Sequence, residues 1–199
     1  MPDPQLSEDT VEAGVSARVE AGTVVSVSRD DAHRFSKPTV ASVTLVEGLG
    51  VAGDSHAGAQ TQHRFLVKKD PGRVNLTQVH LLQSELFAEL TGKGFEVGPG
   101  DLGENVTTSG IDLLGLPLGT RLQLGGEAVV EVTGLRSPCH QIDRFRAGLL
   151  REVIGRDAGG TVIRKTGIMG IVVTGGTVGA GDRVAVRMPA PPFLPLGVV

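Results

Sequence analysis

Glycine interrupts this chain so often that long helices have little room to form. The sequence contains 29 glycines among 199 residues. Glycine reaches the positive-φ backbone conformations that tight turns require, and it weakens the interior of a helix. The segments between the glycines are short and rich in β-branched residues, which is typical of strands. We predict strands at residues 22–28, 40–47, 105–108, 121–124, 128–135, 170–174 and 183–187.

Two segments show the helical spacing of apolar residues instead. The first, 77–90, would carry one apolar face made of Val79, Leu82, Leu86, Phe87 and Leu90. The second, 144–154, repeats the pattern and ends before Gly155. Many short strands with only two helical segments favour a closed or half-closed β-barrel over a doubly wound sheet. We therefore predict a mainly β fold with two or three short helices, of which 77–90 is the longest.

The chain length suits one sizeable hydrophobic core and is short for two. Residues 1–18 are polar and predict a loose leader, whereas residues 189–199 form a proline-rich tail. The segment 19–188 between them is predicted to be a single domain.

Composition excludes several classes of function. The net charge is −3, and the aromatic residues are six Phe with no Trp or Tyr. Such a chain has neither the positive charge nor the stacking platforms that nucleic-acid binding uses. No apolar run approaches the ~20 residues of a membrane-spanning helix, and the N-terminus does not resemble a secretory signal. We expect a cytoplasmic protein that binds neither nucleic acid nor membrane.

The single cysteine, Cys139, lies in the segment Gly-Leu-Arg-Ser-Pro-Cys-His-Gln-Ile-Asp, between the clearest strand and a predicted helix. One cysteine cannot form an intrachain disulfide or a Cys-x-x-Cys metal site. Arg136, His140 and Arg144 lie within a few residues, and cations favour the reactive thiolate form. A lone cysteine is more often a buried core residue. The polar surroundings here favour a reactive centre.

Three other segments are unusually dense in polar residues. They contain His56 in Gly-Asp-Ser-His-Ala-Gly, Thr77 in Asn-Leu-Thr-Gln-Val-His, and Glu104 with Asn105 in Gly-Asp-Leu-Gly-Glu-Asn-Val-Thr-Thr. Thr77 is predicted to cap the first helix. Taken alone, each is most simply a turn or locally hydrogen-bonded residue.

The order of these segments resembles the molybdenum-cofactor sulfurase C-terminal (MOSC) domain family over roughly residues 22–187. The most specific motifs are Gly-Glu-Asn-Val-Thr-Thr at 103–108 and Arg-x-Pro-Cys at 136–139. The resemblance implies a β-barrel of the MOSC, pyruvate-kinase-barrel-like kind, in a small standalone bacterial-type member. Relatives include amidoxime-reducing proteins that bind a molybdopterin cofactor and the C-terminal domain of molybdenum-cofactor sulfurase.

The resemblance also implies roles for individual residues. Cys139 would be the molybdenum ligand or a sulfur acceptor, and Asn105 a contact to the molybdenum cofactor. We expect Glu104, Thr77 and His56 to converge on the same pocket. A molybdopterin is anionic, and Arg64, Arg73 and Arg136 could meet its phosphate. His140, beside the cysteine, is a further candidate for binding the cofactor. Pyridoxal phosphate is not expected, because the desulfurase domain of the full-length sulfurase has no counterpart here.

Three functions remain open from the sequence. The first is a molybdenum-cofactor oxidoreductase that reduces N-hydroxylated compounds with the help of a redox partner. The second is a carrier of persulfide sulfur or cofactor, whose partners would be molybdenum-cofactor enzymes or a cysteine desulfurase. The third is a metal hydrolase that uses Asp54, His56 and His63. The first two use the same cysteine, so the sequence does not decide between them.

Overall fold

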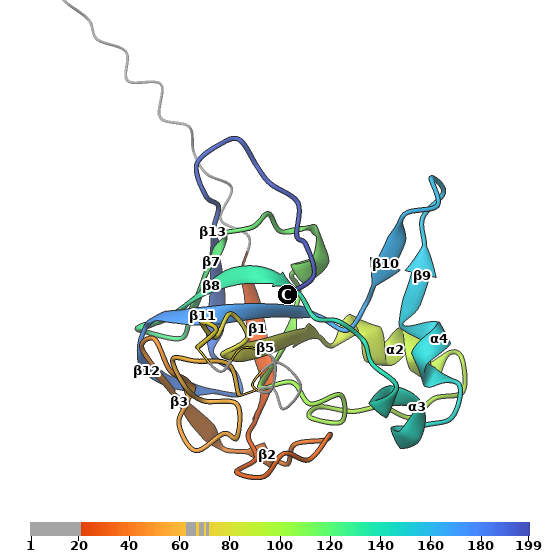
Figure 1. The fold of residues 1–199 in the computed structure, drawn as a ribbon, viewed down its shortest axis with the longest axis horizontal. Coiled ribbons are helices and arrows are strands. Elements are labelled where there is room, and N and C mark those ends of the chain that lie inside the picture. Colours follow the sequence, from red (N-terminus) through yellow and green to blue (C-terminus); the bar gives the residue numbers. More distant parts are fainter. Residues whose placement is uncertain (1–20, 63–66, 68–69, 71) are drawn as a thin grey trace, which may run out of the picture.

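The fold is built on a closed β-barrel. The structure is a computed structural model that describes residues 21–62, 67, 70 and 72–199. Seven of its strands are paired in the order β13-β7-β8-β11-β5-β6-β1, and β13 pairs with β1 to close the ring (Figure 1). These strands are β1 (Ala21–Ser28), β5 (Val79–Gln83), β6 (Val106–Ser109), β7 (Arg121–Leu124), β8 (Ala128–Leu135), β11 (Ile168–Thr174) and β13 (Arg183–Arg187). The predicted mainly β fold is confirmed, and each predicted strand overlaps an observed one.

Smaller elements decorate the barrel. β2 (Thr39–Val40) pairs with β1, and a three-stranded sheet forms from β3 (Ser42–Val46), β4 (Gly50–Val51) and β12 (Gly176–Gly179). The helices are α2 (Glu85–Thr91), α3 (Gln141–Phe145), α4 (Leu149–Glu152) and the 3₁₀ turn η1 (Leu113–Gly115). Figure 1 shows α2, α3 and α4 gathered on one side of the barrel, beside the hairpin of β9 (Ile154–Arg156) and β10 (Val162–Arg164).

Only the second part of the segment 77–90, predicted as one helix, is helical. Its first part is strand β5, which pairs antiparallel with β11 and parallel with β6. Both faces of β5 are buried: Val79 and Leu81 point into the barrel core, while Leu82 packs with Leu86 of α2. A strand buried on both faces has a continuous apolar run, which helical spacing does not distinguish from a buried helix. Accordingly, Thr77 caps no helix, although α2 is the longest described helix.

The predicted helix at 144–154 is also divided. α3 ends at Phe145, where Arg146 takes up an extended conformation, and the left-handed Gly148, with φ +84°, then precedes α4. Leu149 and Val153 pack with α2 in a second hydrophobic core, which is separate from the core inside the barrel, as the spacing predicted. Ile154 instead starts β9 and is partly exposed.

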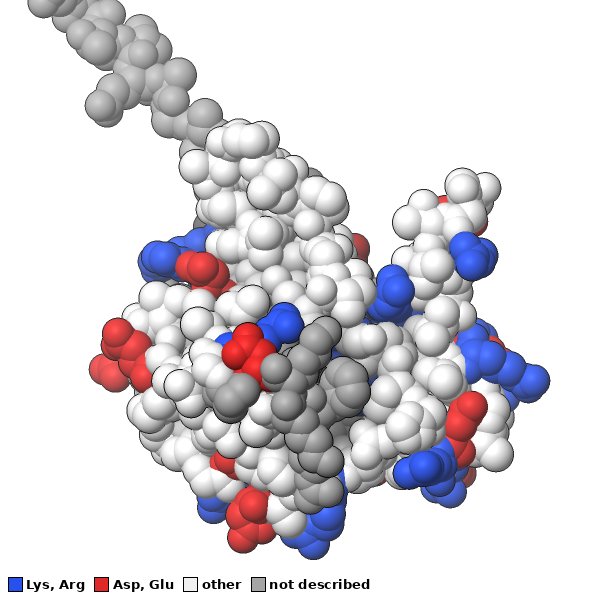
Figure 2. Space-filling model, in the orientation of Figure 1, with Lys and Arg blue, Asp and Glu red and all other residues white. Residues whose placement is uncertain are grey.

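Ion pairs connect the helices on one side of the barrel. Glu89 of α2 accepts hydrogen bonds from Lys165 at 2.6 Å and Lys93 at 2.8 Å, and Lys93 also lies 3.2 Å from Glu152 of α4. These contacts join α2, α4 and the base of the β9–β10 hairpin. Figure 2 shows Lys and Arg side chains along this hairpin and around the helices at its base, with acidic side chains among them.

The proline-rich tail, 189–199, runs back along the barrel. The amide of Leu118 donates to the carbonyl of Leu194, and that of Leu135 donates to Gly197. Val198 forms a parallel bridge with Leu135, the last residue of β8. Among the described helices, none is long and apolar enough to cross a membrane. The predicted leader, 1–18, lies outside the described residues.

Candidate functional site

Strands β1 and β5 and the loops near them bring buried polar residues together. The polar residues with less than a tenth of their surface exposed include Ser28, Asp30, Lys37, Asp54, Asn75, His80, Glu104, Asn105 and Thr166. Buried polar groups are costly unless they are hydrogen-bonded or paired. A cluster of this size therefore indicates a built polar network.

Asp54 and Lys37 form a buried ion pair. The Nζ of Lys37 lies 2.7 Å from Oδ2 of Asp54, and their side chains are 4% and 2% exposed. Burial lowers the pKa of Lys37, while the carboxylate of Asp54 opposes that shift. Burial acts to raise the pKa of Asp54, but the hydrogen bond from His56 and the charge of Lys37 outweigh it and hold that pKa well below its usual range. Asp54 is therefore ionised at neutral pH.

Asn105 connects this pair to two strands. Its Nδ2 donates to Asp54 Oδ2 at 2.9 Å and to the Ser28 carbonyl at 3.2 Å, and its Oδ1 accepts from the His80 amide at 3.2 Å. The side chain is 2% exposed. These contacts all hold parts of the protein together, and the predicted role of Asn105 as a cofactor contact stays a prediction.

His56 reaches the same carboxylate from a different loop. Its Nδ1 donates to Asp54 Oδ1 at 3.2 Å, and its side chain is 34% exposed. Asn75 holds this loop by donating to the carbonyls of His56 and Gly58. The amide and hydroxyl of Thr77 both donate to Asn75 Oδ1 at 3.0 Å. His56 and Asn105 are thus joined through Asp54, and Thr77 is joined to them through Asn75.

His80 is a buried, neutral histidine in β5. Its Nε2 donates to the Thr166 carbonyl at 2.7 Å. Burial and the nearby positive charge of Arg136 lower the pKa of His80 to about 3. At physiological pH the ring therefore carries no charge.

Glu104 is fully buried and only half satisfied. Its Oε1 accepts from the Gly100 amide at 2.6 Å and from Thr107 Oγ1 at 3.1 Å, whereas Oε2 has no partner among the described residues. Burial raises the pKa of Glu104, and the hydrogen bond from Gly100 opposes that shift. The carboxyl group thus orients a backbone amide of its own loop.

Gly100 allows this loop to approach the loop that carries Lys37. Its φ is +84°, and a Cβ added there would lie 2.1 Å from the Lys37 carbonyl oxygen. We expect Gly100→Ala to lower the free energy of unfolding by about 1–2 kcal/mol for the left-handed conformation, and further because the Lys37 loop must move. Urea denaturation measures the change.

Gly94→Ala is the matched control, because Gly94 has φ +83° with no atom within 4 Å of an added Cβ. It shares the conformational cost and lacks the collision. Equal losses in the two variants would show that the close approach at Gly100 carries no energetic weight.

Arg136 lies between the buried network and the cysteine. Its amide donates to the Gly167 carbonyl at 3.0 Å, and its guanidinium lies 5.9 Å from the centre of the Phe35 ring. Burial lowers the pKa of Arg136, while the charges of Cys139 and Glu104 act in the opposite direction. Its Nη1 is buried and has no partner among the described residues.

Cys139 is partly exposed, on the loop between β8 and α3. Its Sγ donates to Gln141 Oε1 at 3.4 Å. Gln141 lines a hollow of about 240 Å³ together with Phe35, Ser36, Arg144 and Phe145. The thiol therefore touches the wall of this hollow, with the Arg136 guanidinium as an electrostatic neighbour.

The remaining residues that the sequence predicted for the site are exposed or lie outside the described residues, apart from Asp54 and His56. His140 is exposed, and Arg73 is also exposed. Arg64 and His63 lie outside the described residues. Asp54 and His56 do meet, but no group of three His, Cys, Asp or Glu that could hold a metal ion occurs in the described part of the chain.

Sequence reasoning missed Lys37 and Phe35 as site residues. Lys37 lies in His-Arg-Phe-Ser-Lys-Pro, a polar loop in which a lysine normally faces solvent. The following proline, which fixes the local backbone, was the only signal nearby. Its burial depends on the loops at 53–58 and 98–105, which are distant in sequence.

Residues 71–185 match the protein family described as the MOSC domain. The YuaD protein from Bacillus subtilis has a similar structure, with a TM-score of 0.71 and 23% identity over 87% of this chain and 99% of that chain. YiiM from Escherichia coli is similar with a TM-score of 0.56 and 18% identity, over 89% of this chain and 73% of that one.

YiiM from Geobacillus stearothermophilus has a TM-score of 0.57 and 18% identity, over 87% of this chain and 77% of that one. No curated protein matches the sequence. At these identities the structural likenesses establish a shared fold.

Proposed function

Because this chain belongs to the MOSC domain family, which is linked to molybdenum-cofactor proteins in general, we propose that it binds a molybdenum cofactor through Cys139 and reduces N-hydroxylated compounds. The observation that carries the proposal is the partly exposed Cys139 thiol with the Arg136 guanidinium as its electrostatic neighbour. A thiolate is a soft ligand that suits a thiophilic metal.

The residues around Cys139 fit an anionic, hydrogen-bonding group. Arg136 has a buried Nη1 without a partner among the described residues, and Arg144 lines the adjoining hollow. Guanidinium groups bind phosphate through paired hydrogen bonds. Cys139 would hold the metal, and Arg136 and Arg144 would hold the phosphate.

The cofactor, when bound, supplies exchange of two electrons with the substrate. The chain itself contributes binding and charge. Arg136 and Arg144 would bind the anionic group, and the aromatic pair Phe35 and Phe145, whose ring centres lie 5.8 Å apart, lines one side of the hollow. Reduction of an N-hydroxylamine to an amine consumes two electrons and two protons and releases water, so a redox partner must deliver the electrons.

Metal analysis tests the assignment of Cys139. We expect the protein purified from a molybdenum-replete host to contain close to one molybdenum per chain, and Cys139→Ser to contain almost none, because a hydroxyl is a poor ligand for a soft metal. Ser137→Ala is the matched control, since Ser137 is exposed in the same loop. Equal molybdenum in the wild type and Cys139→Ser would contradict the proposed ligand.

A sulfur carrier is the second candidate, because a partly exposed thiol beside a cation also suits a persulfide. In that case a cysteine desulfurase would supply the sulfur. The purified protein would be free of molybdenum and would carry cyanide-labile sulfur that Cys139→Ser lacks. The same preparations therefore separate the two functions.

A further inference from the structure

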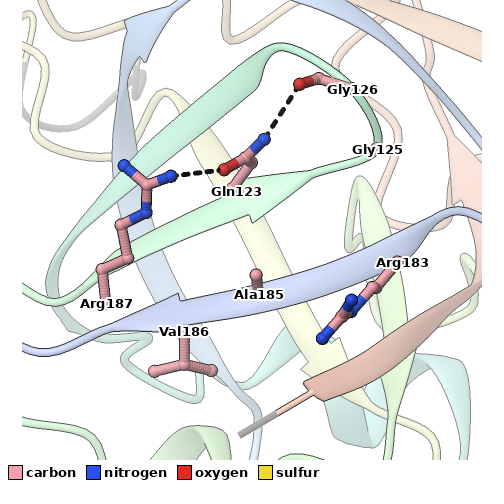
Figure 3. Close-up of a pocket in the computed structure, with 7 residues that line it drawn as sticks. All are labelled: Gln123, Gly125, Gly126, Arg183, Ala185, Val186 and Arg187. Atoms are coloured by element: carbon pink, nitrogen blue, oxygen red, sulfur yellow. Dashed lines mark hydrogen bonds between the residues drawn. The ribbon is translucent and has the colours of Figure 1, made fainter. Parts of the chain in front are cut away.

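A second hollow lies on the outer face of the barrel, over β13 and β7. Its volume is about 460 Å³, and its lining residues are Gln123, Gly125, Gly126, Arg183, Ala185, Val186 and Arg187. Figure 3 shows the side chains of Gln123, Arg183 and Arg187 around the short side chain of Ala185. None of these residues belongs to the network around Asp54 or to the hollow beside Cys139.

Strand geometry explains this arrangement. Alternate residues of a strand face the same side, so Arg183, Ala185 and Arg187 of β13 all point outward, whereas Val184 and Val186 are buried. Ala185 is paired with Gln123 on one side and Ala21 on the other. The short side chains of Ala185 and Ala21 leave space above the strands, and this space is the floor of the hollow. The two arginines flank this floor, with their Cα atoms about 13 Å apart along the strand.

The cations at this hollow are not neutralised by described carboxylates. Arg187 Nη2 donates to Gln123 Oε1 at 2.9 Å, and Gln123 Nε2 donates in turn to the Gly126 carbonyl at 2.9 Å. These bonds fix the Gln123 amide, and among the described residues they account for one of the five N–H groups of Arg187. Arg183 makes no ion pair with any residue in the described part of the chain.

Two acidic residues near this face already have partners. Glu131 pairs with Arg121 at 2.9 Å, and Asp182 Oδ2 accepts the Gly179 amide at 2.8 Å. The whole chain has a net charge of −3. Attraction of anions to this hollow would therefore be local, and would not follow from the charge of the whole protein.

We infer that this hollow binds a small soluble anion with two phosphate groups, one for each arginine. Guanidinium groups recognise phosphate oxygens through paired N–H donors, and the Gln123 amide stands between them on the neighbouring strand. The open floor at Ala185 gives the ligand room to lie along β13. This site is independent of Cys139 and of the proposed cofactor.

Calorimetric titration with pyrophosphate tests the site on the full-length protein. We expect saturable binding that Arg183→Gln and Arg187→Gln each weaken at least about tenfold, which is the loss of one hydrogen-bonded charge. Inorganic phosphate should bind more weakly than pyrophosphate, because it reaches only one arginine. Arg156→Gln, which removes the same charge from the β9–β10 hairpin, should bind pyrophosphate like the wild type.

A second variant tests the position of the ligand without removing charge. Ala185→Leu fills the floor from the outer face, away from the core, so it should abolish pyrophosphate binding while thermal unfolding is unchanged. The absence of saturable binding by the wild type would overturn the inference. So would equal weakening by Arg156→Gln, or binding only to vesicles that contain phosphatidic acid.

Discussion

Replacing Lys37 by methionine is expected to lower the free energy of unfolding by about 3–5 kcal/mol. Methionine keeps the length and apolar stem of lysine but removes the charge that faces Asp54 at 2.7 Å. The Asp54 side chain, 2% exposed, would then be a buried charge without a cation. Urea denaturation followed by circular dichroism gives the change.

Two further variants define what the Lys37 result means. Lys37→Met combined with Asp54→Asn removes both charges and should recover most of the loss, because a buried pair replaced as a whole costs little. Lys93→Met breaks the solvent-exposed pairs with Glu89 and Glu152 and should cost far less than Lys37→Met, because water screens exposed charges. A Lys37→Met loss as small as that of Lys93→Met would contradict a tightly buried pair.

Acidification is expected to destabilise the protein through His80 from about pH 6.5 downward. The pKa of His80 is lowered to about 3 in the folded protein, against 6.5 for an ordinary histidine, because burial and the charge of Arg136 oppose protonation. Below pH 6.5 His80 is therefore protonated in the unfolded chain, whereas in the folded chain it stays neutral until about pH 3. Stability falls across this window by up to about 1.4 kcal/mol per pH unit, or about 5 kcal/mol in all.

His80→Gln isolates this contribution, because glutamine keeps an N–H donor for the Thr166 carbonyl but does not titrate. Urea midpoints at pH 7, 6 and 5 should fall in the wild type and change much less in the variant. At those values most carboxyl groups remain ionised, so His80 dominates the difference. Parallel pH profiles for the two proteins would show that His80 is protonated normally in the folded state.

Local sequence patterns predicted the strands well and the helices poorly. The run Ala-Val-Val-Glu-Val-Thr in β8 alternates between buried and partly buried residues, so its period of two is visible in the sequence. In β5 the two faces pack against different cores, so that Val79 and Leu82 are both buried. The division at Gly148 depends on a left-handed conformation that a glycine permits and does not require.

In the candidate site, too, some residues could be identified from the sequence and others depend on tertiary packing. Cys139 was identified from the cations near it in sequence, and Asn105 and His56 from the resemblance of their motifs to the MOSC domain family. The contact between Asn105 and Asp54 joins positions 51 residues apart, and no local pattern contains it. Lys37 was missed because its loop is buried only when Gly100 lies against it. Tertiary packing turned an apparently exposed lysine into the partner of a buried carboxylate.

Closure of the barrel by β1 and β13 has a consequence for how the protein folds during synthesis. Ala21 is paired with Ala185, so one edge of the first barrel strand, β1, stays unpaired until the last strand, β13, has been synthesised. Roughly 150 residues must be translated between them, which takes on the order of 10 seconds at cellular elongation rates. Until then β1 and β7 each present an unpaired edge of the kind that recruits other chains into aggregates. Yield in a heterologous host should therefore depend on chaperone capacity and on temperature.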